Sequence, residues 1–292
     1  MPLARLSTLR VGGVARKLIA PRQPDELAEY LQAADQAGRP AAILGRGSNT
    51  LIRDGVIETP VILMSRFSRQ ISVSPDSGEI SADAGAPLPE IARRAADAGV
   101  AGLEYLAVIP GLFGGGVIMN CGIGGSGGPC IADDLISVDS IAFDGHQART
   151  RAGALSAQYR SIDLPEPGVV TAGMLLGQPG YRPSEIHAEI DRLKTARKLR
   201  QPQTRRTSGS VWLPADGRPA GALLDECGLR GFSIGRACIS RDHANWIVTK
   251  RGCTPDEAID LVDAVEGRVR DLMGIELERE LRLLPPNPSS DG

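Results

Sequence analysis

The sequence has 292 residues, 42% of them hydrophobic, and its 33 Lys and Arg residues are balanced by 35 Asp and Glu residues. This composition suffices for one large globular domain or two smaller ones, and the lack of excess positive charge argues against general nucleic-acid binding. Five Cys residues without a CxxC pair favour reduced thiols, and neither a secretory signal nor a membrane span is evident, so we expect a soluble, cytoplasmic protein.

The chain opens with a βαβ-like pattern. A short strand is predicted at residues 17–20, an amphipathic helix at 24–38, and a second strand at 40–44 that enters a glycine turn. Shorter runs follow from residue 61. They predict one hairpin of strands 70–74 and 79–84, and a second hairpin of strand 136–143 with the segment after Asp144-Gly145. They also predict a helix at 87–98 and a buried strand at 169–176. These elements together predict an α+β domain.

A helix predicted at 184–199 ends in LRQPQTRRTSG, a basic and polar stretch typical of a connector between domains. Beyond it the pattern predicts a smaller α+β unit, with strands at 209–213, 245–249 and 276–284 and helices at 219–227 and 255–273. We therefore predict a first domain at 1–200 with subdomains of about 1–60 and 61–200, a second domain at 201–285, and a polar tail at 286–292.

The segment 105–132 holds no charged side chain, and nine glycines lie between Ile109 and Gly128. Because glycine has no Cβ, backbone N–H groups in such a segment can press against a ligand, which favours binding of a large phosphorylated cofactor. A flexible linker is the alternative, but interleaved apolar residues such as Phe113 need burial. A membrane span is disfavoured because Pro110 and the glycines interrupt the apolar run.

A second glycine turn, ILGRGSNTLI at residues 43–52, follows the predicted strand at 40–44. Its backbone N–H groups and its small polar side chains, Ser48 and Asn49, suit the oxygens of a pyrophosphate. The turn lacks the GxGxxG spacing of a dinucleotide-binding fold, and a plain tight turn would explain it alone about as well. Two such segments in one domain strengthen the prediction of a phosphorylated cofactor.

Six motifs follow one another along nearly the whole chain: GRGSNTLIRDG (45–55), GLEYLAVIPGLFGGGVIMNCG (102–122), YRSIDL (159–164), GSVW (209–212), HANWIV (243–248) and LERELRLL (277–284). In order and spacing they resemble the UDP-N-acetylenolpyruvoylglucosamine reductase family, also called UDP-N-acetylmuramate dehydrogenases. The resemblance implies a vanillyl-alcohol-oxidase-type (PCMH-type) FAD-binding domain followed by a smaller α+β substrate domain. The short connection after the Tyr159 segment resembles the family branch without an inserted tyrosine loop.

The resemblance also implies the chemistry. NADPH would reduce a noncovalently bound FAD, and a hydride would then pass to the enolpyruvyl ether of UDP-N-acetylglucosamine enolpyruvate, giving UDP-N-acetylmuramate for peptidoglycan synthesis. The cofactor contacts implied by the family motifs lie in the two glycine segments, at Gly45, Arg46, Gly47, Ser48, Asn49, Ile109, Pro110, Gly111, Gly114, Gly115, Asn120 and Gly122.

Three further residues match catalytic positions of the family. Arg160 would pair with the substrate carboxylate, Ser210 would protonate the carbanion-like carbon, and Glu280 would polarise the carboxylate or relay protons. Without the resemblance, the sequence would indicate only an ordinary surface arginine at Arg160 and a turn or strand-edge serine at Ser210. Glu278 lies two positions from Glu280 and therefore on the same strand face, so only the family motif favours Glu280.

Other polar residues are expected to be structural. His243 and Asn245 precede an apolar run and are predicted to organise the second domain. No His, Cys or carboxylate group has metal-ligand spacing, so no catalytic metal is expected. Cys121 and Cys130 lie in or near the glycine-rich segment and could tether a flavin through sulfur, but small buried thiols are the commoner explanation.

Two departures from the family pattern leave the substrate open. Trp212 is followed by Leu213 and Pro214, where the family usually has lysine and asparagine, and the family's tyrosine after the motif Asn120 is absent. One alternative is therefore a paralogous flavin reductase that acts on a different unsaturated acid in specialised metabolism. Another is a non-catalytic module that binds flavin or nucleotide. The only partner expected is a small-molecule substrate, with neither nucleic acid nor membrane.

Overall fold

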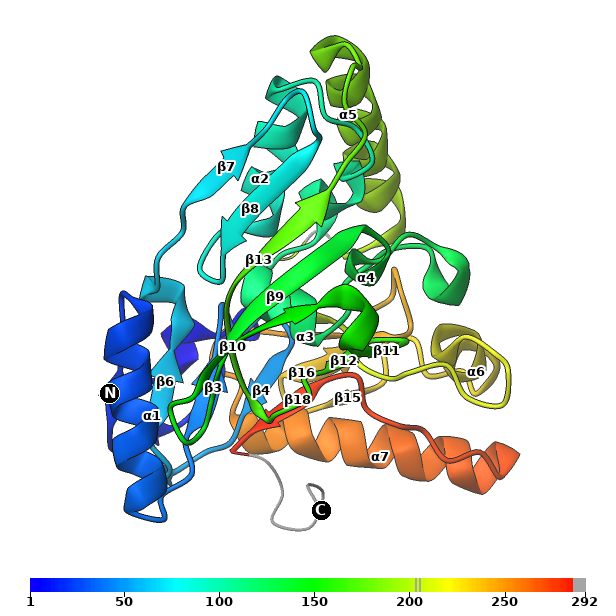
Figure 1. Ribbon diagram of the computed structural model, residues 1–292. Coiled ribbons are helices and arrows are strands. Elements are labelled where there is room, and N and C mark those ends of the chain that lie inside the picture. Colours follow the sequence, from blue (N-terminus) through cyan, green and yellow to red (C-terminus); the bar gives the residue numbers. More distant parts are fainter. Residues whose placement is uncertain (203, 205, 286–292) are drawn as a thin grey trace. The chain divides into compact units, whose positions relative to one another are not determined.

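The computed structural model describes residues 1–202, 204 and 206–285, so the predicted polar tail at 286–292 lies outside the described residues (Figure 1). The chain forms two compact units, each assembled from separate stretches. The C-terminal unit combines Met1–Leu18, Arg46–Pro60 and the described residues from Lys198 onward. The central unit combines Ile19–Gly45 and Val61–Arg197. Two N-terminal segments thus pack with the residues of the predicted second domain.

The first strands and helix form as predicted. The helix α1 (Pro24–Gln36) starts with a proline followed by two acidic residues, a sequence that suits a helix N-terminus. Strands β2 (Leu18–Ile19), β6 (Val61–Leu63) and β3 (Ala42–Leu44) form a sheet in that order, with β3 and β6 parallel. The strand β6 therefore lies between the two strands of the predicted βαβ-like pattern.

A five-stranded antiparallel sheet forms the middle of the central unit (Figure 1). Its strands lie in the order β10 (Gln147–Arg151), β9 (Leu135–Ala142), β13 (Gly168–Leu176), β8 (Glu79–Asp83) and β7 (Ile71–Val73). Both predicted hairpins, β7 with β8 and β9 with β10, are confirmed. The strand β13 is buried on both faces, because its neighbouring residues Val169 and Val170 belong to two different core clusters.

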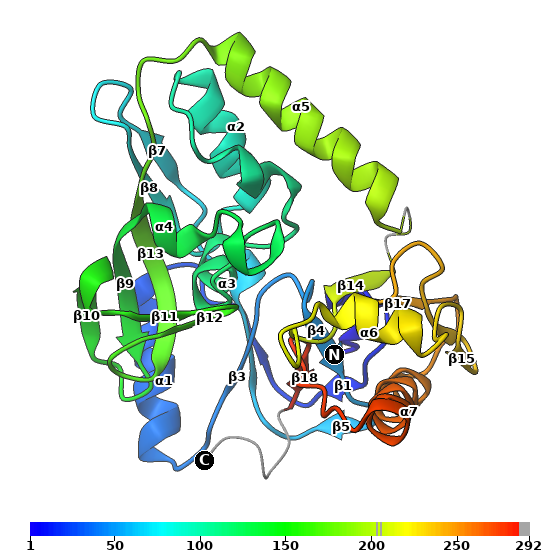
Figure 2. The same cartoon turned by 90° about the vertical axis from the view of Figure 1, so that its right-hand side faces the viewer.

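Helices cover both faces of this sheet (Figure 2). The core on one face includes residues of α2 (Leu88–Asp97), α3 (Phe113–Ile118) and α5 (Pro183–Arg200), and the core on the other includes residues of α1. The helix α2 packs there because its buried residues recur at helical spacing and form one apolar stripe, at Leu88, Ile91, Ala92, Ala95 and Ala96. Each large aliphatic side chain in such a stripe contributes about 1.5–3 kcal/mol through burial.

The C-terminal unit packs a four-stranded antiparallel sheet with two helices. The strands lie in the order β14 (Thr207–Ser210), β17 (Trp246–Thr249), β16 (Ala237–Ile239) and β15 (Ser233–Ile234). The helices α6 (Ala220–Glu226) and α7 (Pro255–Met273) share one core with this sheet. The bounds of α7 match the prediction because both ends are capped, by a box of Thr254 with Glu257 and by Gly274 at φ 70°.

The last predicted strand is only partly formed. The strand β18 (Arg282–Leu284) pairs in parallel with β4 (Thr50–Ile52), whereas the preceding residues lie outside any strand. The N–H groups of both Glu280 and Leu281 donate to the carbonyl of Val211, at 2.8 and 3.2 Å. Because two successive residues share one acceptor, a regular ladder cannot continue through them.

Smaller elements complete the two units. The C-terminal unit has a second parallel pair, β1 (Val14–Ala15) with β5 (Val56–Ile57). The central unit has the short helix α4 (Ile131–Asp134) and a hairpin of β11 (Ser156–Gln158) with β12 (Ser161–Asp163). Within the described ranges, none of the helices is both long and apolar enough to cross a bilayer, and His, Cys, Asp and Glu nowhere gather in threes as a metal site requires.

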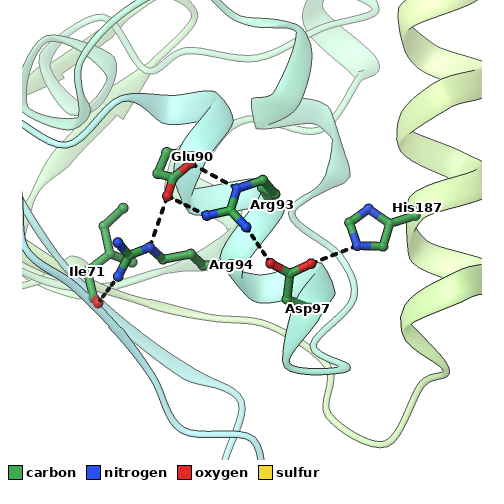
Figure 3. Close-up of polar contacts among 6 residues, drawn as sticks. All are labelled: Ile71, Glu90, Arg93, Arg94, Asp97 and His187. Atoms are coloured by element: carbon green, nitrogen blue, oxygen red, sulfur yellow. Dashed lines mark hydrogen bonds and ion pairs between the residues drawn. The ribbon is translucent and has the colours of Figure 1, made fainter.

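A charged network anchors α2 to the neighbouring strand β7 (Figure 3). Arg93 and Arg94 both bind the carboxylate of Glu90, at 2.6 and 3.1 Å. Arg94 also donates to the carbonyl of Ile71 in β7 at 3.0 Å. The hydrogen bond from Arg93, supported by Arg94, lowers the pKa of Glu90 to about 2.

The same network continues to α5 (Figure 3). Arg93 binds Asp97 at 2.5 Å, and Asp97 lies 2.9 Å from Nε2 of His187 in α5. His187 is therefore accounted for by a surface contact between two helices. Because these side chains are largely exposed, each pair contributes little individually.

Replacing Glu90 with Gln is expected to lower the free energy of unfolding near pH 7 by less than about 1 kcal/mol, because its side chain is 33% exposed and solvent screens the pairs. Since the pKa of Glu90 is lower in the folded chain, its carboxylate stabilises above about pH 4.5, and this contribution disappears as the pH falls toward about 2. Urea unfolding at several pH values measures the difference. Glu29→Gln, an exposed change on α1, is the control, and a Glu90→Gln effect that stays constant on acidification would contradict the assignment.

Candidate active site

The first glycine turn presents backbone N–H groups for which the described residues supply no acceptor. Gly47 is buried at φ 61°, and an added Cβ would lie 2.4 Å from the carbonyl oxygen of Leu6, so only glycine fits. In the part of the chain that the structure describes, nothing accepts a hydrogen bond from the N–H of Arg46, Gly47 or Ser48. Successive N–H groups of this kind form an anion-binding concavity, which fits a pyrophosphate.

Asn49, the last residue of this turn, holds another segment of the C-terminal unit. Its Nδ2 donates to the carbonyl of Glu280 at 2.9 Å, and its own carbonyl accepts from the N–H of Arg282 at 3.1 Å. The side-chain amide was predicted to contact the cofactor. In the structure this amide connects the glycine turn to the segment that carries a proposed catalytic carboxylate.

The second glycine segment contains a helix, α3, that the sequence did not predict. An added Cβ would lie 2.9 Å from the side chain of Ala84 at Gly114, and 3.0 Å from the nearest side-chain atom at Gly116. These two glycines therefore allow α3 to pack closely within the central unit. Gly115 is exposed, and nothing lies within 4 Å of an added Cβ there, so a ligand can approach its backbone.

Some N–H groups of this segment are already hydrogen-bonded within the described part of the protein, and others are not. The N–H of Gly114 donates to the carbonyl of Ala84 at 3.1 Å and is not available to a ligand. The N–H groups of Gly111, Leu112 and Gly115 have no acceptor among residues 1–202, 204 and 206–285. Both glycine segments thus offer unpaired donors, and the residues present fit the phosphates of FAD.

The remaining predicted contacts, all in the central unit, differ in exposure. Gly45 and Ile109 are half-buried, and Pro110 is exposed. Asn120 is different, because its side chain is buried and both ends of its amide bind protein atoms. Its Nδ2 donates to the carbonyl of Gln158 at 2.8 Å, and its Oδ1 accepts from the N–H of Ala132 at 3.1 Å.

Arg160 is held against the end of the glycine-rich segment. Its guanidinium donates to the carbonyls of Asn120 and Gly122, at 3.4 and 3.1 Å, and lies 4.7 Å from the ring centre of Tyr159. The backbone of Arg160 has a φ of 61°, and that of Asn120 a φ of 37°. Positive φ values cost a non-glycine residue about 1–3 kcal/mol and cluster at functional sites. The guanidinium is therefore oriented by the same glycine-rich segment whose unpaired N–H groups fit a phosphate.

Ser210 lies at an irregularity of β14. Its strand pairs Thr207 with Val248 and Ser210 with Trp246, so three steps on β14 match two on β17. The extra residue forms a bulge at Gly209, which has a φ of 80°. Bulges change the direction of the following side chain, and here that side chain belongs to Ser210.

Two buried hydroxyls lie just before this bulge. Of the described residues, none hydrogen-bonds to Oγ1 of Thr207 or to Oγ of Ser208. Ser208 is only 4% exposed. An unpaired buried hydroxyl is costly, and such groups often mark the position of a water or ligand atom.

Glu280 and Ser210 lie on adjacent segments of the C-terminal unit. The N–H of Glu280 donates to the carbonyl of Val211, the residue after Ser210, at 2.8 Å. Glu280 is half-buried, whereas Glu278 is exposed, a difference that periodicity could not reveal. Arg160 belongs to the central unit, so the structure brings two of the three predicted catalytic residues together within one unit.

Asn245 fixes the backbone that follows Ser210. Its Oδ1 accepts from the N–H groups of Val211 and Trp212, at 3.2 and 2.9 Å, and its Nδ2 donates to the carbonyl of Trp212 at 2.8 Å. The N–H of Asn245 donates in turn to Nδ1 of His243 at 3.3 Å. These contacts agree with the organising role predicted for both residues, and burial lowers the pKa of His243.

The cysteines near the glycine-rich segment are reduced and poorly activated. All five Cys residues are free thiols. Burial raises the pKa of Cys121 to about 12, and burial also raises the pKa of Cys130. Because the thiolate is the nucleophile, neither residue is prepared to form a bond to a flavin.

Replacing Asn120 with Ala should lower the free energy of unfolding by about 1–3 kcal/mol, because the variant loses the two hydrogen bonds that the buried amide makes to the carbonyl of Gln158 and the N–H of Ala132. Asn120→Asp should retain the acceptor for Ala132 but would place a carboxylate oxygen against the carbonyl of Gln158 at a buried position, so its effect should be at least as large. Urea unfolding followed by circular dichroism measures both. Equal stability of the Ala variant and the parent would contradict an anchoring role.

Known proteins match the chain over nearly its whole length. Residues 201–284 match the model of the UDP-N-acetylenolpyruvoylglucosamine reductase C-terminal domain, and residues 15–151 match that of an FAD binding domain. The UDP-N-acetylenolpyruvoylglucosamine reductases of Synechococcus sp. (strain WH7803) and Streptococcus pneumoniae (strain 70585) are each 36% identical to it, over 97% of this chain and 92% of theirs.

A solved structure is similar throughout. The crystal structure of UDP-N-acetylenolpyruvylglucosamine reductase from Thermus caldophilus has a TM-score of 0.81 and 31% identity, covering 97% of each chain. The predicted α+β fold class with an FAD-binding domain is confirmed. Because its relatives match over nearly their full length, the chain belongs to the UDP-N-acetylenolpyruvoylglucosamine reductase family.

Proposed function

We propose that the protein reduces UDP-N-acetylglucosamine enolpyruvate to UDP-N-acetylmuramate with NADPH, a step in the synthesis of peptidoglycan precursors. The observation that carries this proposal is the near full-length similarity to reductases of that name, together with the presence of Arg160, Ser210 and Glu280. The enzyme would work in the cytoplasm on a small-molecule substrate, without nucleic acid or membrane. Its FAD-binding domain would comprise residues 1–200, although Met1–Leu18 and Arg46–Pro60 pack with the C-terminal unit, and its substrate domain would comprise residues 201–285.

The chain's own groups account for cofactor binding. FAD, when bound, supplies the hydride transfer that connects NADPH to the substrate. Unpaired N–H groups of Arg46, Gly47 and Ser48 in one segment, and of Gly111 and Gly115 in the other, would bind its phosphate oxygens. Neither Cys121 nor Cys130 is activated for a covalent bond, so the cofactor would be held by noncovalent contacts alone.

The three proposed catalytic residues have separate tasks. The substrate's carbon–carbon double bond gains a hydride at its methylene carbon and a proton at the neighbouring carbon. Arg160 would bind the substrate carboxylate and offset the negative charge that develops on it. Ser210 would donate the proton from its hydroxyl, and Glu280 would polarise the carboxylate or return a proton to the serine. A serine is a weak acid, so its neighbours must place it accurately.

Ser210→Ala should leave the reduction of the flavin by NADPH intact and slow its reoxidation by UDP-N-acetylglucosamine enolpyruvate by about 100-fold or more, the usual contribution of a positioned proton donor. Anaerobic stopped-flow absorbance of the flavin separates the two half-reactions. Ser233→Ala, an exposed position in the same sheet, is the control. Unchanged reoxidation in the Ser210 variant would remove this residue from the proton-donor role.

The same experiment with the parent protein tests the function itself. Rapid reoxidation by the UDP-sugar supports the proposal. Reduction by NADPH without reoxidation would favour the alternative function, a reductase that acts on another unsaturated acid. Leu213 and Pro214, which stand where the family usually has lysine and asparagine, are the observation that favours this alternative. Absence of bound flavin would contradict both enzyme functions.

Acid precipitation should release the yellow cofactor into the supernatant, because the thiols of Cys121 and Cys130 are protonated and form no bond to it. Absorbance of supernatant and pellet measures the distribution, with FAD added to a flavin-free protein as the control for trapping. Yellow colour that remains in the washed pellet would show a covalent bond. Cys121→Ala and Cys130→Ala would then identify the attachment site.

A further inference from the structure

Trp212 and Arg279 form a cross-strand pair between the two segments that carry Ser210 and Glu280. They are joined by an antiparallel bridge, with hydrogen bonds from the N–H of Leu213 to the carbonyl of Glu278 at 2.9 Å and from the N–H of Glu280 to the carbonyl of Val211 at 2.8 Å. In such a pair the two residues do not bond to each other's backbone, and their side chains lie close together on one face.

Both side chains bind one carboxylate in α7, that of Glu266. The indole Nε1 of Trp212 donates to Oε1 at 2.8 Å. Arg279 donates from Nε to Oε1 at 2.7 Å and from Nη2 to Oε2 at 2.6 Å, a bidentate contact. Trp212 is 1% exposed, and the side chains of Glu266 and Arg279 are 19% and 26% exposed. Three charge-assisted hydrogen bonds therefore converge on a mostly buried group.

This contact indicates the face of the segment on which Glu280 lies. Successive side chains of an extended chain point in opposite directions, so Arg279 directed at α7 places Glu280 on the other face. The backbone of Glu280 is held as well, since its N–H binds Val211 and its carbonyl accepts from Asn49 at 2.9 Å. The backbone that carries the carboxylate is thus held by Val211 and Asn49.

We propose that Glu266 is a positioning residue for proton delivery to the substrate, and that it acts by holding Trp212 and Arg279 together. The residue after Ser210 pairs with Glu280, and Trp212 and Arg279 are the next pair along. By fixing this pair, Glu266 fixes the spacing between the serine hydroxyl and the glutamate carboxylate. The inference rests on the proposed function for the identity of the step.

Glu266→Gln is the direct test. The amide keeps the shape of the side chain, and its oxygen can still accept from Trp212 and from Nε of Arg279, but its NH₂ group faces the donor Nη2 of Arg279, so the bidentate contact is lost. Reoxidation of the reduced flavin by UDP-N-acetylglucosamine enolpyruvate should slow about 10-fold or more, a loss in kcat rather than in KM. Reduction by NADPH should keep its rate, because it requires neither Ser210 nor Glu280.

Matched variants separate positioning from general damage. Asp271→Asn removes a carboxylate that is 77% exposed in the same helix, and it should leave both half-reactions unchanged. Trp212→Phe removes only the indole donor and should slow reoxidation to a smaller extent than Glu266→Gln. If the Glu266 variant fails to bind FAD, the Trp212 variant supplies the test. Reoxidation at the parent rate in Trp212→Phe, or in a folded Glu266→Gln, would overturn the proposal.

Hydrogen exchange gives a readout without substrate. The amides of Leu213 and Glu280 should exchange faster in Glu266→Gln than in the parent or in Asp271→Asn, whereas the amides of the central sheet should not change. Unchanged protection at both amides would overturn the positioning role whatever the substrate is. If the UDP-sugar does not reoxidise the flavin of the parent protein, the proposed function is wrong. Faster exchange of the Leu213 and Glu280 amides in Glu266→Gln would then still show that Glu266 holds this backbone pairing.

Discussion

The carbonyl of Val211 is the acceptor on which the proposed chemistry of the C-terminal unit depends. It binds the N–H groups of both Glu280 and Leu281, and it lies directly after Ser210. This shared bond joins two segments far apart in the sequence and interrupts the strand that would otherwise run through Glu280. A serine hydroxyl is a weak acid, and its use in proton transfer requires that its neighbours be placed before the substrate arrives. In the proposed mechanism, the irregular pairing would supply this placement.

Three asparagines fix the irregular segments where regular pairing is absent. Asn49 holds the carbonyl of Glu280, Asn120 joins two chain segments beside Arg160, and Asn245 holds the backbone after Ser210. An amide side chain carries a donor and an acceptor at once, so it can replace a missing backbone partner in either direction. An aspartate could only accept. The glycine segments leave N–H groups open for a ligand, and the asparagines beside them keep the remaining backbone in position.

Much of the fold followed from the sequence because periodicity and caps specify it. The capped helix α7 and both hairpins formed as predicted, whereas α3 was missed because its glycines have low helix propensity and are tolerated only through close packing against Ala84. The motifs identified Asn120 as a family residue but not that its amide binds protein atoms. Glu266 was also missed, although it lies between Val262 and Val269 at helical spacing, on the stripe that α7 buries. A carboxylate on such a stripe requires a partner, and its partners are distant in sequence.

The same pairing explains how the chain can depart from its family after Trp212. Leu213 keeps its N–H bonded to the carbonyl of Glu278, so the pairing that places Ser210 and Glu280 does not require a lysine side chain at this position. Pro214, which has no N–H, follows where the pairing needs no further donor from this segment. Leucine and proline remove a charge and an amide that could contact an anionic substrate, but they leave the backbone around Ser210 intact. The substitutions therefore bear on which substrate binds, while the proposed proton delivery would depend on the backbone bonds and on the contact with Glu266.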